Sequence, residues 1–204
     1  MTTAPHLLFL PGAGGAAPFW HPLGALLPAD WAKTYLNWPG LGHEGHREGF
    51  DGFDALTAWA ERHLAEGDTV VVAQSMGAIV ALRLALRFPG RISKLVLTAG
   101  SGGLDMGRFG AADWRPAYRA AFPAAARWIE TEKPDHTAEI GRIAQATLLL
   151  WGDADAISPV GVGRHLERLL PHARLHIIAG GDHDFAKERA AEIAPLVTAH
   201  IGGI

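Results

Sequence analysis

Two polar residues in this sequence, Ser75 and His183, have the types and surroundings that nucleophilic chemistry needs. Ser75 follows an apolar β-branched run and precedes a segment whose apolar residues recur at helical spacing. The small residues Ala73 and Gly77 stand two positions to either side, which allows a strand and a helix to approach closely around a sharp turn. The pattern predicts a serine hydroxyl held out at the tip of a strained strand–turn–helix. A serine N-cap on a buried helix is the alternative interpretation.

A serine hydroxyl is a weak nucleophile at neutral pH, so it needs a base, and the base needs a partner that fixes its tautomer. Among the histidines, only His183 is predicted at the carboxyl end of a strand, beyond the last strand of the sheet. Two acid candidates, Asp153 and Asp155, follow the strand before it. The order Ser, Asp, His accompanies a strained serine turn in this kind of sheet. The alternatives are a surface-loop histidine and a turn aspartate ahead of Ser158.

The elements that must position these residues alternate between strands and helices. Strands are predicted at residues 6–10, 33–38, 70–74, 92–98, 147–151 and 174–179, and helices around 19–27, 53–64, 77–86, 160–170 and 185–200. This alternation favours an α/β fold with a doubly wound, mostly parallel sheet of about six strands and helices on both faces. Ligands of such sheets bind beyond the carboxyl ends of the strands, where the three polar positions fall.

Composition narrows the class of protein. The 204 residues fit a single domain over 1–204, and nearly half of them are apolar. The net charge of −3 and the lack of a basic patch argue against nucleic acid as a partner, and no apolar run is long enough for a membrane span. The first residues lack a signal-like pattern, so we expect a cytoplasmic protein with a small-molecule substrate. The absence of cysteine excludes disulfides and thiolate sites, and the sequence predicts no oligomeric state.

Over nearly its whole length the chain resembles the α/β-hydrolase fold family. The G-x-S-x-G nucleophile elbow of that family corresponds to Ala73–Gly77, with alanine in place of the first glycine. The family's G-x-x-D-x-x-x-P acid motif matches Gly152–Pro159, so the resemblance implies Asp155 as the acid, with Asp153 in reserve. The family's histidine loop matches Gly180–His183. The family's usual amino-terminal hairpin is missing, which implies a trimmed version of the fold.

The resemblance also implies an oxyanion hole. The run Pro11–Gly14 occupies the place of the family's H-G-x-G loop, with proline in place of histidine. The implied donors are the backbone N–H groups of Met76 and of Ala13 or Gly14, which do not depend on side-chain identity. The implied reaction is acyl transfer through an acyl-serine, on a small carboxylic ester, thioester or lactone, with no metal and no cofactor.

Residues 101–145 break the alternation and are too many for an ordinary loop, so we expect a short helical insertion that acts as a lid. Its aromatic residues Trp114, Tyr118 and Phe122 are four apart and share one helix face. They either cap the core or roof an apolar acyl pocket. The candidate pocket residues are Gly14, Phe19, Trp20, Trp114 and Tyr118.

Two other motifs in the sequence depart from the patterns they resemble. Residues 12–17 fit a dinucleotide fingerprint, but the next strand ends without the acid that a ribose needs. The run His43–His46 resembles a zinc-binding helix motif, but its spacing is wrong. The alternative functions are another activity on the same triad, such as a carbon–carbon hydrolase, a cofactor-free perhydrolase or a lyase, and a non-catalytic ligand-binding homologue.

Overall fold

The computed structural model describes residues 4–203 and contains one six-stranded sheet. Its strands are β1 (His6–Leu10), β2 (Ala32–Tyr35), β3 (Thr69–Gln74), β4 (Ile92–Thr98), β5 (Ala146–Gly152) and β6 (Ala173–Ile178). They lie in the order β2-β1-β3-β4-β5-β6, and every neighbouring pair is parallel. The predicted doubly wound α/β fold is therefore confirmed, with a sheet that is wholly parallel.

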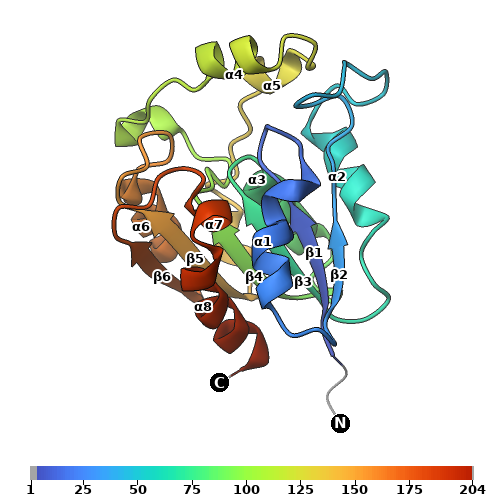
Figure 1. Cartoon of the computed structure of the whole chain (residues 1–204), viewed down its shortest axis with the longest axis vertical. Coiled ribbons are helices and arrows are strands. Elements are labelled where there is room, and N and C mark those ends of the chain that lie inside the picture. The colour runs from blue at the N-terminus through green and yellow to red at the C-terminus, as the bar shows by residue number, and fades with distance from the viewer. Residues whose placement is uncertain (1–3, 204) are drawn as a thin grey trace.

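Helices cover both faces of this sheet (Figure 1). The main ones are α1 (His21–Leu26), α2 (Phe53–Glu61), α3 (Gly77–Arg87), α6 (Val160–Leu169), α7 (Phe185–Glu188) and α8 (Ala190–Gly202). One core cluster joins alternate strand residues such as Leu8 and Val71 to α2, α3 and α6. The other joins the intervening residues, such as Leu7 and Val70, to α1, α7 and α8. This alternation is the period of two that a strand buried on both faces requires.

The chain between β4 and β5 leaves the sheet and carries short helices of its own. They are η2 (Met106–Phe109), α4 (Arg115–Ala121), α5 (Trp128–Thr131) and η3 (Ile140–Arg142). We call residues 101–145 the insertion. Figure 1 shows α4 and α5 above the end of the sheet opposite to the two termini, which is the end where the parallel strands finish. The insertion therefore lies over the edge at which ligands of such sheets bind.

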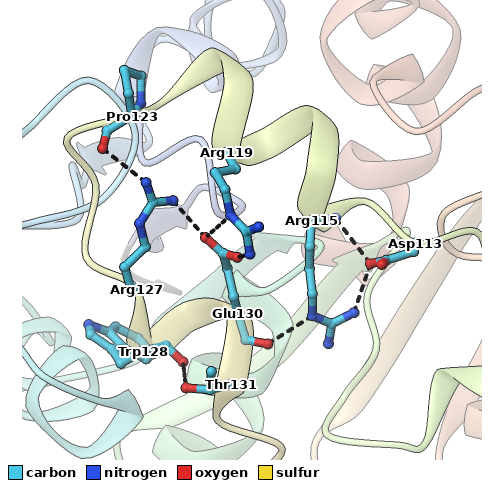
Figure 2. Close-up of polar contacts among 8 residues, drawn as sticks. All are labelled: Asp113, Arg115, Arg119, Pro123, Arg127, Trp128, Glu130 and Thr131. Atoms are coloured by element: carbon cyan, nitrogen blue, oxygen red, sulfur yellow. Dashed lines mark hydrogen bonds and ion pairs between the residues drawn. The ribbon is translucent and has the colours of Figure 1, made fainter.

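A buried carboxylate holds α4 and α5 together (Figure 2). The side chain of Glu130 is 4% exposed and pairs with the guanidinium groups of Arg119 and Arg127. These two guanidinium groups, Arg119 first, hold the pKa of Glu130 below its usual range, so the carboxylate stays charged. Arg115 adds a hydrogen bond from its Nε to the backbone carbonyl of Glu130, at 2.8 Å. These ion pairs and hydrogen bonds connect the two short helices and stabilise them, since helices of this length are marginally stable alone.

Element bounds differ most from the predictions at two places. The second strand ends at Tyr35 and not at residue 38, because the chain then bonds to the loop after β1, with Trp38 N donating to Gly15 O at 3.0 Å. The predicted last helix is divided at Arg189, where the backbone leaves helical geometry. Within residues 4–203, no helix combines the length and the apolar character needed to cross a bilayer.

Candidate active site

Ser75 stands at the turn between β3 and α3 with a φ of 53°, a left-handed conformation that is uncommon for a residue with a side chain. Its N–H donates to Thr98 O at 2.9 Å, and its carbonyl accepts from Ala78 N at 3.1 Å. These bonds to β4 and α3 hold the strained turn in place. The predicted strand–turn–helix around Ser75 is therefore present, and Ser75 is not an N-cap, since no side-chain cap bond starts α3.

The three polar side chains converge at the carboxyl edge of the sheet. The imidazole Nε2 of His183 lies 2.9 Å from Ser75 Oγ. Its other nitrogen, Nδ1, lies 2.8 Å from Asp155 Oδ2. Since Asp155 accepts the Nδ1–H, Nε2 carries the lone pair that faces the serine hydroxyl. This is the hydrogen-bonded chain that a serine nucleophile requires.

Asp155 is fixed by its own loop. Its side chain is fully buried. Its Oδ1 accepts the N–H groups of Ile157 at 2.8 Å and Ser158 at 2.9 Å, so Oδ2 is left for His183. Asp153, the reserve acid of the sequence analysis, instead accepts the N–H of Gly180. The geometry therefore favours Asp155 over Asp153 as the partner of the histidine.

The glycine loop after β1 packs directly against the serine turn. A Cβ on Gly77 would lie 2.6 Å from Pro11 O, and a Cβ on Gly12 would lie 3.1 Å from Ser75 Cβ. Only hydrogen fits at these two positions without displacing backbone or the nucleophile. Within residues 4–203, the N–H groups of Ala13, Gly14 and Met76 donate to no protein acceptor. Unused donors from both the glycine loop and the serine turn thus lie at the site, as an oxyanion hole needs.

Gln74 is a site residue that the sequence analysis missed. Its side chain is almost fully buried, and its Nε2 donates to the backbone carbonyl of His183 at 3.3 Å. A Cβ on Gly12 would lie 2.1 Å from Gln74 Oε1, so the amide also packs against the glycine loop. Gln74 therefore joins the serine turn, the histidine loop and the glycine loop. Its position beside Ser75 was the only signal in the sequence.

The expectation that Trp20 lines the pocket is wrong. Its ring is fully buried in the core cluster under α1, α7 and α8, and its Nε1 donates to Leu10 O at 3.0 Å. A buried indole N–H needs a hydrogen-bond acceptor, and here the acceptor is the carbonyl at the end of β1. Phe19 packs edge-on against Trp20 and is only partly buried, and its contact with a substrate stays a prediction.

The insertion brings its aromatic residues to the glycine loop. Trp114, Tyr118 and Phe122 form a row of contacting rings on one side of α4. A Cβ on Gly14 would lie 3.8 Å from Phe122 Cζ, which places Phe122 over the loop. A cavity of about 290 Å³ opens beside His183, lined by Asp155, Ile157 and neighbouring residues. Within the described part of the chain, three or more metal-ligating side chains do not gather at any point.

The chain matches known proteins in sequence. Pimeloyl-[acyl-carrier protein] methyl ester esterase of Neisseria meningitidis serogroup C is 33% identical over 145 residues, which are 70% of this chain and 51% of that protein. The chain spans about half the length of the first curated relatives it matches. The 2-hydroxy-6-oxo-6-phenylhexa-2,4-dienoate hydrolase of Comamonas testosteroni is 22% identical over 91% of this chain and 82% of that protein.

The fold and a family model agree with these matches. A thermophilic esterase from Thermogutta terrifontis superimposes with a TM-score of 0.78 at 18% identity, covering 100% of this chain and 91% of that one. At this identity the likeness concerns the fold alone. The model of the alpha/beta hydrolase fold matches residues 5–129, which is more than half of the chain. The chain therefore belongs to the alpha/beta hydrolase fold family.

Proposed function

We propose that this protein is a serine hydrolase that cleaves a small carboxylic ester, thioester or lactone through an acyl-serine intermediate. The observation that carries the proposal is the unbroken series of hydrogen bonds from Ser75 Oγ through His183 to the buried carboxylate of Asp155. No general base other than an imidazole is within hydrogen-bonding reach of the hydroxyl among residues 4–203. The residue types and their order match the roles of nucleophile, base and orienting acid.

In the first half of the reaction, His183 Nε2 accepts the proton of Ser75 as Oγ attacks the substrate carbonyl carbon. The carbonyl oxygen gains negative charge and receives hydrogen bonds from the N–H of Met76 and from that of Ala13 or Gly14. Each such donor contributes about 3–4 kcal/mol of barrier lowering in related chemistry. The imidazolium, stabilised by Asp155, then returns its proton to the leaving alcohol or thiol as the tetrahedral intermediate collapses.

In the second half, water takes the place of the departed alcohol. His183 accepts a proton from the water, whose oxygen attacks the acyl carbon, and the same N–H groups stabilise the second oxyanion. Collapse of this intermediate breaks the bond to Ser75 Oγ, which regains its proton from His183. The acid product leaves and the enzyme returns to its starting state. Every proton is accounted for by His183.

The surroundings of the site and the relatives support the choice of a substrate class. Phe122 presents apolar surface next to Gly14 of the glycine loop. Relatives of this chain include enzymes named for methyl ester hydrolysis. An uncharged small ester is therefore the first substrate to try.

A second candidate is hydrolysis of a carbon–carbon bond on the same triad. It is favoured by the relative named 2-hydroxy-6-oxo-6-phenylhexa-2,4-dienoate hydrolase, which aligns with most of this chain. The two activities differ in their leaving group, which is an alcohol in one and a carbanion in the other. A dienoate or β-diketone substrate measured beside p-nitrophenyl esters separates them, because the preferred activity has the higher kcat/KM.

The test of the proposed function uses a chromogenic ester series of rising chain length and the variant Ser75→Ala. We expect wild-type turnover of the short esters and a loss of about 10³-fold or more in Ser75→Ala. A fluorophosphonate probe should label the wild-type chain once, at Ser75, and leave the variant unlabelled. Retained turnover in Ser75→Ala, or an unlabelled wild-type chain, would remove Ser75 from this role.

A further inference from the structure

Four successive carbonyl groups, from the end of β1 into the glycine loop, each accept a hydrogen bond. Trp20 Nε1 donates to Leu10 O at 3.0 Å, and Trp38 Nε1 donates to Pro11 O at 2.8 Å. The backbone N–H of Gly15 closes onto Gly12 O at 3.0 Å. The fourth donor is the hydroxyl of Tyr118, which lies 3.0 Å from Ala13 O. Trp20, Trp38 and Gly15 lie outside the insertion, and only Tyr118 belongs to it.

The Tyr118 hydroxyl is fully engaged. It donates to Ala13 O and accepts the N–H of Gly42 at 3.2 Å, so it bridges the glycine loop and the loop after β2. Tyr118 is 7% exposed. Burial raises the pKa of its phenol above the usual range, so the group remains an O–H donor throughout the neutral range. A buried, protonated hydroxyl with two backbone partners has one orientation.

The peptide between Ala13 and Gly14 is planar, so fixing the Ala13 carbonyl also fixes the Gly14 N–H, which points the opposite way. Glycine accepts almost any backbone conformation, so this peptide would otherwise rotate at little cost. A rotated peptide would aim a carbonyl oxygen where the substrate oxyanion needs an N–H. Such an acceptor would repel the developing negative charge in place of stabilising it.

From these contacts we infer that Tyr118 is a positioning residue for the oxyanion hole, holding the Ala13–Gly14 peptide so that the Gly14 N–H serves as the loop's donor to the oxyanion. The inference rests on the proposed hydrolase function and deepens it. Because Tyr118 belongs to α4, the glycine loop takes its active conformation only when the insertion is packed against it. The ion pairs of Glu130 cross-link α4 to α5 (Figure 2). This cross-link keeps α4 at the position from which the Tyr118 hydroxyl reaches the glycine loop.

The test compares Tyr118→Phe with Tyr35→Phe. The chain has two tyrosines, so the second variant is a matched control that removes the other phenol oxygen, on β2. Rates are expressed per active site titrated with a fluorophosphonate, which corrects for any unfolded fraction. We expect kcat for a short ester to fall about ten- to hundredfold in Tyr118→Phe, with KM changed by less than about threefold. Tyr35→Phe should keep the wild-type kcat.

A second measurement separates positioning from general loosening. A trifluoromethyl ketone, which becomes a tetrahedral oxyanion on Ser75, should bind Tyr118→Phe more weakly by the same factor as the loss of kcat. The matching methyl ketone, which stays trigonal, should bind both proteins equally. Equal kcat per titrated site in the two tyrosine variants, or equal weakening of both ketones, would overturn the role of Tyr118. A wild-type chain that neither labels nor turns over esters would instead refute the proposed function, and this inference with it.

Discussion

Replacing Asp155 by asparagine isolates the electrostatic and tautomeric role of the acid, because the new side chain has the same shape. The amide oxygen of the introduced asparagine would still accept the N–H groups of Ile157 and Ser158, so the loop should keep its conformation. The amide nitrogen would then face His183 Nδ1, where the carboxylate now lies 2.8 Å away. An N–H donor at that point requires Nδ1 to be an acceptor, which moves the imidazole proton to Nε2.

An imidazole with its proton on Nε2 cannot take the proton of Ser75. The variant also lacks the negative charge that stabilises the imidazolium in both halves of the reaction. In a triad of this kind the same exchange costs about 10⁴ in kcat. At about 1.36 kcal/mol for each factor of ten, this corresponds to about 5.4 kcal/mol of lost transition-state stabilisation.

The assay is the steady-state hydrolysis of a short p-nitrophenyl ester, with Asp153→Asn as the control. Asp153 accepts one N–H from Gly180, whereas His183 Nδ1 pairs with Asp155, so an amide oxygen at position 153 can keep the bond to Gly180. We expect kcat to fall about 10³- to 10⁴-fold in Asp155→Asn and to stay within about twofold of wild type in Asp153→Asn. A loss of less than tenfold in Asp155→Asn, or a larger loss in Asp153→Asn, would refute the assignment of the acid.

Two further predictions concern stability. Gly77→Ala should lower the free energy of unfolding by about 1–3 kcal/mol, because its Cβ would lie 2.6 Å from Pro11 O and 2.8 Å from Leu10 O, and an unchanged thermal midpoint would contradict this packing. Burial, with Lys94 and Arg174 nearby, lowers the pKa of His200, so the unfolded chain binds the proton more readily. Stability should therefore decline as the pH falls below about 6.5, and His200→Gln, measured by denaturant unfolding at several pH values, should flatten that decline. A pH dependence identical in both proteins would exclude His200 as a source.

The strands and the convergence of the three polar residues could be predicted because each depends on local patterns. The fourth strand was placed at residues 92–98, as the structure has it, since its apolar run is bounded by clear turn residues. Asp155 and His183 meet Ser75 because parallel strands end at one edge, so a residue's place just after a strand fixes its region in space.

What could not be predicted depends on where individual side chains turn. The closeness of Trp20 to the glycine loop in sequence suggests a place near the site, but its indole is buried with α1, α7 and α8, on the face of the sheet opposite to Tyr118. The spacing predicts Tyr118 on an apolar helix face, but its polar hydroxyl makes the important contact, with a loop 105 residues earlier in the sequence. Spacing reports the face of a helix, whereas the partner of a polar atom depends on tertiary packing.

The path of the insertion has a consequence for the evolution and redesign of this fold. Residues 101–145 leave the sheet after β4 and return to β5, its immediate neighbour, while Ser75, Asp155 and His183 all lie outside that stretch. A cassette with this connectivity can be exchanged for another without cutting the framework that carries the nucleophile. A transplanted cassette would, however, have to bring a hydroxyl to Ala13 O. Exchanging the cassette would therefore change the reaction rate as well as the substrate selectivity.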